Sequence, residues 1–262
     1  MHHNLTMETT EHQQRVISQF TLQAKPFAKH QAHSQRESFE NLRDLAQLTG
    51  TERVLDCCCG PGLVSCYLAD FAREVVGVDL TQAMVDQARA SAAAKSLANV
   101  SFQTGNASEL PFAEGEFDVT VSRYAFHHLE NPEAAFGEMV RVTRSGGRIV
   151  VADVAIPLAK RERYDAFEKR RDPSHAKALT LEELFYLGER AGLGEVTIRT
   201  FGVPMTVDSL VDSSFPDPAD REVLKQMMAA DVGVDAMGFN ARREDGACLL
   251  TFPIAVLAWT RP

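Results

Sequence analysis

Short apolar segments and amphipathic segments alternate through the first two thirds of the chain. Apolar runs that suit buried strands lie at 54–57, 75–78, 100–103, 117–121 and 148–152. Segments with helical spacing of their apolar residues separate most of these runs, at 63–71, 82–94 and 132–142. Alternation of this kind predicts an α/β fold, in which helices cover both faces of a mainly parallel sheet.

Helical patterns also lie on either side of this region. Apolar positions recur at helical spacing within residues 1–50, and Pro26 is expected to break or kink them into two helices. Thr180 and Glu183 fit a capping box at the start of a later helix, which Gly192 would end.

Two further strands are predicted near the end of the chain, at 195–203 and 247–259. The sequence shows no repeat, low-complexity tract or linker, so one domain is the simplest interpretation. Residues 51–154 would form its core. Residues 155–180 and 204–246 would form a cover over a site, because long connections often carry lids.

Charge and hydropathy narrow the function classes. Lys and Arg total 27 against 36 Asp and Glu, a net charge of −9, which argues against a nucleic-acid-binding surface. No apolar run approaches the roughly 18 residues of a membrane span. The N-terminus lacks the order of a secretory signal. We therefore expect a soluble protein of the cytoplasm.

Three of the five cysteines, Cys57, Cys58 and Cys59, are adjacent. Neighbouring residues of a strand point to opposite faces, so these thiols would not converge on one ion. We predict no metal site and interpret the cysteines as small buried residues in a reducing compartment.

The strongest chemical signal follows the first predicted strand, where Gly60-Pro61-Gly62 precedes a helix. Glycines there let a ligand approach the backbone, and the helix N-terminus offers free N–H groups. Asp79 ends the next strand, about twenty residues on, where an acid can accept hydrogen bonds from ribose hydroxyls. This arrangement predicts a site for an adenosine-containing ligand.

A nicotinamide dinucleotide is the first alternative. Its usual G-x-G-x-x-G fingerprint needs a third glycine, but Leu63-Val64-Ser65 follows Gly62 here. Asp56 also precedes the glycines, where a carboxylate would repel a pyrophosphate and attract an amino group. Both features favour a ligand with a cationic amino-acid end.

Several segments resemble class I S-adenosylmethionine-dependent methyltransferases. Val54 to Gly62 is similar to motif I of that family. The chain also resembles the family's ubiquinone/menaquinone-biosynthesis-like branch (methyltransferase type 11). This resemblance lies at Gly105–Phe112, Phe117–Val119, Ala125–Leu129 and Arg148–Asp153. The resemblance covers roughly residues 15–202. It implies a Rossmann-like, doubly wound, seven-stranded sheet with an antiparallel last strand, S-adenosylmethionine as cofactor, S-adenosylhomocysteine as product and a small-molecule acceptor.

The resemblance also implies the cofactor-binding residues. They are Asp56, Cys57, Gly60 and Gly62 for the methionine part and ribose, Asp79 for the ribose hydroxyls, Leu80, Asn106 and Ala107 at the adenine, and Ser122 and Arg123 at the methionine end. The chain departs from the family at two positions. Cys58 stands where glycine is common, and Asn106 stands where Asp is common.

The acceptor side is less specific. His127 and His128 lie at a predicted strand end, where either could act as general base or only bond a backbone carbonyl. His175 is a candidate for substrate contact, with a structural turn as the alternative. Residues of the N-terminal helices could close over the site. The candidates are Phe20, Gln23, Phe27 and His30, with core packing as the alternative.

We expect methyl transfer to a small molecule by in-line displacement. The same fold and cofactor could instead serve a cyclase or a binding module, and a nicotinamide-dependent oxidoreductase is the remaining alternative. The sequence leaves open the acceptor, the methylated atom (O, N or C) and whether the protein forms a homodimer.

Overall fold

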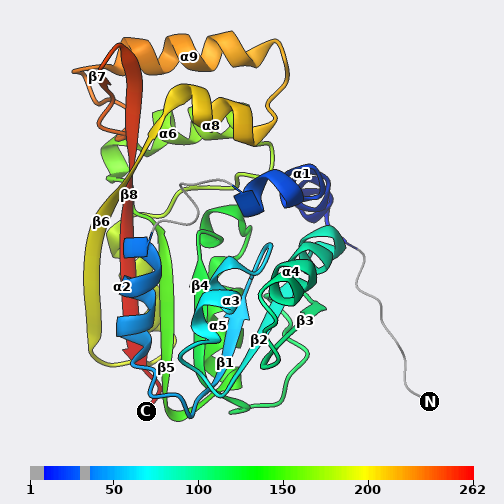
Figure 1. Ribbon diagram of the computed structural model, residues 1–262. Helices are drawn as coiled ribbons and strands as arrows, with labels where there is room; N and C mark the ends of the chain where they lie inside the picture. The colour runs from blue at the N-terminus through cyan, green and yellow to red at the C-terminus, as the bar shows by residue number, and fades with distance from the viewer. Residues whose placement is uncertain (1–8, 30–35) are drawn as a thin grey trace.

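The fold is built on one twisted, mostly parallel sheet (Figure 1). The computed structural model describes residues 9–29 and 36–262. Its eight strands are β1 (Arg53–Cys57), β2 (Glu74–Asp79), β3 (Val100–Thr104), β4 (Phe117–Arg123), β5 (Thr143–Val154), β6 (Val196–Thr206), β7 (Arg242–Glu244) and β8 (Ala247–Thr260). They follow the order β3-β2-β1-β4-β5-β8-β6, and β7 pairs with β8. The first five pair in parallel, whereas β8 is antiparallel to both β5 and β6.

Helices cover both faces of this sheet. They are α1 (Glu11–Lys29), α2 (Arg36–Ala46), α3 (Leu63–Leu68), α4 (Gln82–Ala94), the short 3₁₀ helix η2 (Phe126–His128), α5 (Pro132–Val142), α6 (Leu158–Arg171), α7 (Leu181–Arg190), α8 (Val207–Ser214) and α9 (Asp220–Asp231). α2, α3 and α4 lie on one face, and α5 and α7 on the other. Because side chains alternate along a strand, β1 sends Val54 to the first core and Leu55 to the second.

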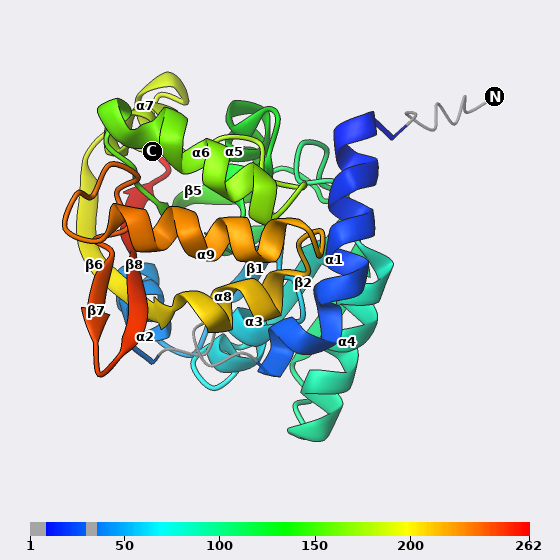
Figure 2. The same ribbon diagram turned by 90° about the horizontal axis from the view of Figure 1, so that it is seen from above.

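The remaining helices gather at the carboxyl ends of the parallel strands. β6 and β8 pair along the whole of β6 and extend past the other strands. α6, α8 and α9 pack near this extension, with α1 beside them (Figures 1 and 2). Ligand sites of open α/β sheets lie at this edge, so the helices cover the place where a site is expected.

Most predicted elements are confirmed, with several differences. Two helices, α1 and α2, form near the N-terminus as expected, but α1 continues through Pro26 to Lys29. The strand β5 begins at Thr143, before the predicted start at residue 148. The short β7 makes eight strands where seven were expected. Within the described ranges, no helix is long and apolar enough to cross a membrane.

The capping box predicted at the start of α7 is confirmed, since Thr180 and Glu183 form it. Asn131 caps α5 through its side chain, which accepts the backbone N–H of Ala134. Thr81 occupies the N-cap of α4, but its side chain makes no capping hydrogen bond.

Close packing between α7 and β8 gives a stability prediction. A Cβ on Gly188 would lie 2.1 Å from Nε1 of the buried Trp259, whereas one on Gly137 in α5 would meet nothing within 4 Å. We expect Gly188→Ala to lower the free energy of unfolding by about 1–3 kcal/mol through overpacking. The matched control Gly137→Ala should leave it unchanged or raise it by up to about 1 kcal/mol. Urea unfolding measures both, and equal effects would contradict this packing.

Candidate functional site

The turn after β1 approaches β2 closely. The backbone N–H of Cys59 donates to the carbonyl oxygen of Val78 at 2.9 Å. Gly60 and Gly62 have positive φ angles of 52° and 78°, a region open to glycine at little steric cost. Cys58 also has a positive φ, 61°. The cysteine therefore adopts a glycine-like conformation, which costs about 1–2 kcal/mol for a residue with a Cβ.

Asp79 joins this turn to the end of β2. Its Oδ2 accepts the backbone N–H of Gly60 at 2.9 Å, and its Oδ1 accepts that of Thr81 at 2.9 Å. Burial raises the pKa of Asp79, although these hydrogen bonds oppose the shift. Each carboxylate oxygen has a second lone pair, so Asp79 can still accept hydrogen bonds from two hydroxyl groups.

Asp56 is an almost completely buried carboxyl group in β1. The hydroxyl of Ser65 donates to its Oδ2 at 2.5 Å. Burial raises the pKa of Asp56 to about 7, although the Ser65 hydrogen bond and the positive charge of Arg123 oppose the shift. A buried acid with a raised pKa gains from a cation placed beside it. The position beside the Asp56 carboxyl group is therefore favourable for an ammonium group.

These groups line a cavity of about 320 Å³, which we call the strand-end cavity. Most of the predicted cofactor residues line it: Asp56, Gly60, Asp79, Leu80, Asn106, Ala107 and Arg123. Cys57, Gly62 and Ser122 are not among its lining residues, and their cofactor roles stay predictions. Cys57 packs in the apolar core, and Ser122 is fully buried in β4.

Asn106, which stands where Asp is common in the family, has a side-chain oxygen that can accept hydrogen bonds. Its side-chain oxygen accepts the backbone N–H of Ser108 at 3.0 Å. An amide oxygen has two lone pairs, so one remains for a donor such as an adenine amino group.

The helix α1 forms the outer wall of the strand-end cavity, to which it contributes Val16 and Phe20 among others. Nε2 of His12 lies 2.7 Å from the carbonyl oxygen of His128. The amide of Gln19 donates to the carbonyl oxygen of Ser214 in α8 at 2.7 Å. The first turn of α1 is thus held to the segment after β4 through His12, and the middle of the helix is held to α8 through Gln19.

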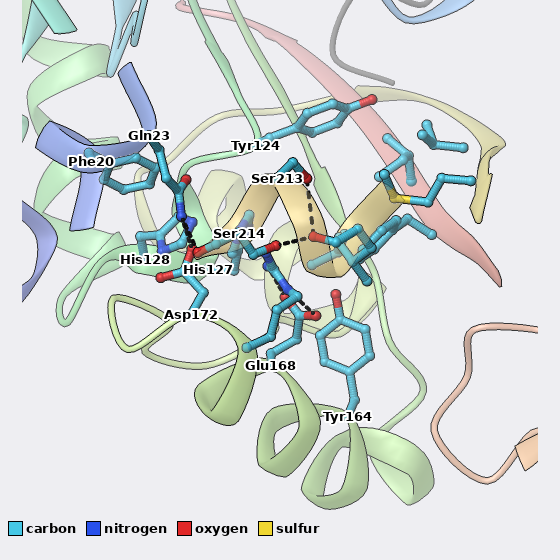
Figure 3. A pocket seen from close by; sticks show the side chains of 17 residues that line it. Phe20, Gln23, Tyr124, His127, His128, Tyr164, Glu168, Asp172, Ser213 and Ser214 are labelled. Carbon is cyan, nitrogen blue, oxygen red and sulfur yellow. Dashed lines mark hydrogen bonds and ion pairs between the residues drawn. The ribbon is translucent and has the colours of Figure 1, made fainter. Parts of the chain in front are cut away.

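A second cavity, which we call the α6 cavity, lies next to the first and measures about 100 Å³. Phe20, Tyr124 and His128 line both cavities. Polar side chains from α1, η2 and α6 gather on one side of the α6 cavity (Figure 3). Besides Phe20, its apolar lining includes Val154, Val203, Met205, Leu210, Phe252 and Ile254.

The charged side chains that line the α6 cavity on α6 are paired. Nε and Nη2 of Arg171 donate to the two carboxylate oxygens of Glu168, and Nη1 donates to Oγ of Ser214 at 2.7 Å. All three guanidinium nitrogens of Arg171 therefore donate to protein groups. Asp172, just after α6, accepts the backbone N–H of Ser174 at 2.9 Å.

His127 and Asp153 form a buried pair between β4 and β5. Nδ1 of His127 lies 2.6 Å from Oδ1 of Asp153. Burial lowers the pKa of His127, but the Asp153 carboxylate outweighs burial and the net shift is upward. With Nδ1 donating to the carboxylate, the neutral imidazole has its lone pair on Nε2. His127 lines the α6 cavity.

His128 lies next to His127, with 4.1 Å between the ring centroids. Its Nδ1 is 3.1 Å from both the hydroxyl and the carbonyl oxygen of Ser174. Burial, and after it the charge of His127, lower the pKa of His128 well below its usual value. The His128 ring is therefore neutral near pH 7, at the boundary between the two cavities.

The predicted substrate residues have different outcomes. His175 lines neither of these two cavities, and its Nε2 lies 2.8 Å from Oδ1 of Asp165. His30 and the side chain of Phe27 lie outside the described part of the chain. Phe20 lines both cavities, and Gln23 lines the α6 cavity.

Sequence reasoning missed several residues around the α6 cavity. Asp153 could have been identified, because it is an acid at the end of a predicted strand. Tyr164 and Arg171 gave no signal, since they lie on a strongly polar helix whose contacts depend on tertiary structure.

Comparison with known proteins agrees with this geometry. A family model described as "Methyltransferase domain" matches residues 55–151. The uncharacterized methyltransferase YcgJ of Bacillus subtilis is 30% identical over 78% of this chain and 81% of its own length. A demethylmenaquinone methyltransferase of Thermus thermophilus is 32% identical over 82% of this chain and 84% of its own.

Solved structures give the same result. The crystal structure of YcgJ superposes with a TM-score of 0.79 at 26% identity, over 87% of this chain and all of that one. A geranyl diphosphate C-methyltransferase from Streptomyces coelicolor, in complex with S-adenosyl-L-homocysteine, shares the fold at a TM-score of 0.62 and 16% identity, over 86% of this chain and 78% of that one. The chain therefore belongs to the class I S-adenosylmethionine-dependent methyltransferases.

Proposed function

We propose that this chain transfers the methyl group of S-adenosylmethionine to a small molecule held in the α6 cavity. The observation that carries the proposal is that the strand-end cavity and the α6 cavity meet at three shared residues, Phe20, Tyr124 and His128. A methyl group at that boundary could pass from a cofactor in one cavity to an acceptor in the other. The His127–Asp153 pair lies beside the same boundary.

The residues of the strand-end cavity fit the cofactor. Asp56 would take the ammonium group, because its burial leaves it short of positive charge. Asp79 would accept hydrogen bonds from the ribose hydroxyls, and Leu80 and Asn106 would contact the adenine. When bound, S-adenosylmethionine supplies a methyl group on positively charged sulfur and leaves as S-adenosylhomocysteine. The chain then has to align the acceptor and remove its proton.

His127 is the proposed general base. Asp153 holds its Nδ1, so the lone pair of the neutral ring lies on Nε2. His128 is less suited to the role because its pKa is lowered and its Nδ1 is engaged by Ser174. We assign His128 to the wall at which the two cavities meet.

The cofactor end gives a pH prediction. Binding an ammonium group at Asp56 requires the carboxylate, and the pKa of this acid is about 7 in the free protein. As the pH falls below about 7, S-adenosylhomocysteine should therefore bind up to about tenfold more weakly per pH unit. Calorimetry near pH 6.5 in buffers of different ionisation enthalpy should detect proton release on binding. Asp56→Asn should bind more weakly and release no proton from this site, and unchanged proton release would contradict the assignment.

The base gives a kinetic prediction. His127→Asn can retain a hydrogen bond to Asp153 while removing Nε2, so kcat should fall by about 10²–10⁴. With the intact chain, kcat should rise with pH through an apparent pKa above about 6.5, because the raised pKa of His127 must be exceeded before the ring is neutral. The other titratable or charged groups around the ring are Asp153, Glu168, Arg171, His128 and His175.

In the matched variant His128→Asn, kcat should still rise with pH as in the intact chain; this rise is the acidic limb of the pH profile. Formation of S-adenosylhomocysteine with a panel of hydroxyl, amine and enol compounds measures both variants. Binding of S-adenosylmethionine without any product from the panel would favour the cyclase or binding module instead. An acidic limb that disappears with His128 and not with His127 would reverse the two roles.

A further inference from the structure

Tyr164 has a buried hydroxyl group without a hydrogen-bond partner among the described residues. Its side chain is completely buried, and its ring stacks on Phe239 with 4.6 Å between centroids. Tyr164 lines the α6 cavity, and Figure 3 shows it rising from α6 with its hydroxyl directed inward. A buried hydroxyl that lacks a partner is unfavourable. An acceptor atom on a bound molecule would relieve it.

The two charged side chains of α6 that line the α6 cavity, Glu168 and Arg171, form an ion pair with each other. Glu168 uses both oxygens and Arg171 all three guanidinium nitrogens in contacts with protein groups. Asp172 accepts from Ser174 and, at 3.3 Å, from the amide of Gln23. Arg171 is neutralised by Glu168, so a carboxylate or phosphate group in this cavity would lose water without gaining a counter-ion.

The size of the cavity also limits its occupant. A volume of about 100 Å³ is smaller than the roughly 150 Å³ of an engineered apolar cavity that binds benzene. That space suits a compact molecule of no more than one ring. Its apolar lining, which includes Met205 and Phe252, favours rings over polar chains.

We propose that the α6 cavity takes a compact ring compound without an anionic group, which presents a hydroxyl group to His127 and is anchored at another polar atom by the hydroxyl of Tyr164. The inference rests on the proposed function and adds the chemical class of the acceptor. Tyr164 is here a binding residue that sets specificity, and His127 is the catalytic one.

The reaction then balances without a further reagent. The hydroxyl proton of the acceptor passes to Nε2 of His127 as the hydroxyl oxygen forms a bond to the methyl carbon. The carbon–sulfur bond breaks, and its electron pair stays on sulfur. The products are a methyl ether, S-adenosylhomocysteine and an imidazolium ion, which Asp153 stabilises until the proton leaves to solvent.

The charge of the acceptor is tested with a pair of one-ring probes, phenol and benzoate. Calorimetry with the S-adenosylhomocysteine-bound protein should give at least tenfold tighter binding of phenol than of benzoate. With S-adenosylmethionine, phenol should yield a methyl ether. Preference for benzoate, or no binding of phenol, would overturn the inference.

The role of Tyr164 is tested with Tyr164→Phe. Removing an unpartnered buried hydroxyl should leave Tm unchanged or raise it, whereas loss of a structural hydrogen bond would lower it. KM for the hydroxylated acceptor should rise about threefold to tenfold, with kcat and the Kd of S-adenosylhomocysteine nearly unchanged. Tyr67→Phe is the control, since the Tyr67 hydroxyl lies away from both cavities and accepts from Nη1 of Arg43 at 3.3 Å. A lower Tm with unchanged KM in Tyr164→Phe would overturn the anchoring role.

Binding of S-adenosylhomocysteine distinguishes a failure of the proposed function from a failure of the inference on the acceptor. If the free protein does not bind it, the proposed function fails. If it binds and the protein prefers anionic acceptors, only the inference on the acceptor fails.

Discussion

The carboxylate of Asp153 fixes the loop on which both cavities depend. It is fully buried at the end of β5 and accepts the backbone N–H groups of Phe126 and Val154, each at 2.6 Å, as well as Nδ1 of His127. Burial raises its pKa, but the charge of His127 and these hydrogen bonds outweigh burial and keep Asp153 ionised. The loop from β4 to η2 is thereby held against β5, so Tyr124 and His128 stand between the two cavities.

Three carboxyl groups at the same edge of the sheet, the buried Asp56 and Asp153 and the half-buried Asp79, differ in chemical role because their surroundings differ. Asp153 is satisfied by backbone donors and a histidine, which suits a positioning role. Asp79 receives two backbone N–H groups and keeps lone pairs for a ligand. Burial raises the pKa of Asp56 to about 7 although Ser65 donates hydrogen bonds to it, so a cation would be most favourable there.

The sequence was sufficient to predict the core of this fold and one side of the site. The motif from Val54 to Gly62 and the acid at Asp79 are local, because glycines and strand ends place them without long-range information. The course of α1 through Pro26 was not predicted, since packing of that helix against α4 and α8 outweighs the proline preference.

The acceptor side could not be predicted in the same way. Tyr164 meets Met205 and Phe252 at one cavity only because β6 and β8 extend beyond the sheet and α6 folds against this extension. Those residues are about 40 to 90 positions apart, and no spacing in the sequence relates them. The His127–Asp153 pair likewise forms across 26 residues, through two neighbouring parallel strands and not through a motif.

The proposed reaction requires the reacting end of the cofactor to lie where the two cavities meet. Crystals of the chain with the selenium analogue of S-adenosylhomocysteine would locate that end, because anomalous scattering finds one selenium atom without assuming how the ligand is oriented. We expect a single peak beside Phe20, Tyr124 and His128, with the adenine toward Asn106. A selenium peak at the Asn106 end, or outside the strand-end cavity, would rule out methyl transfer at this boundary.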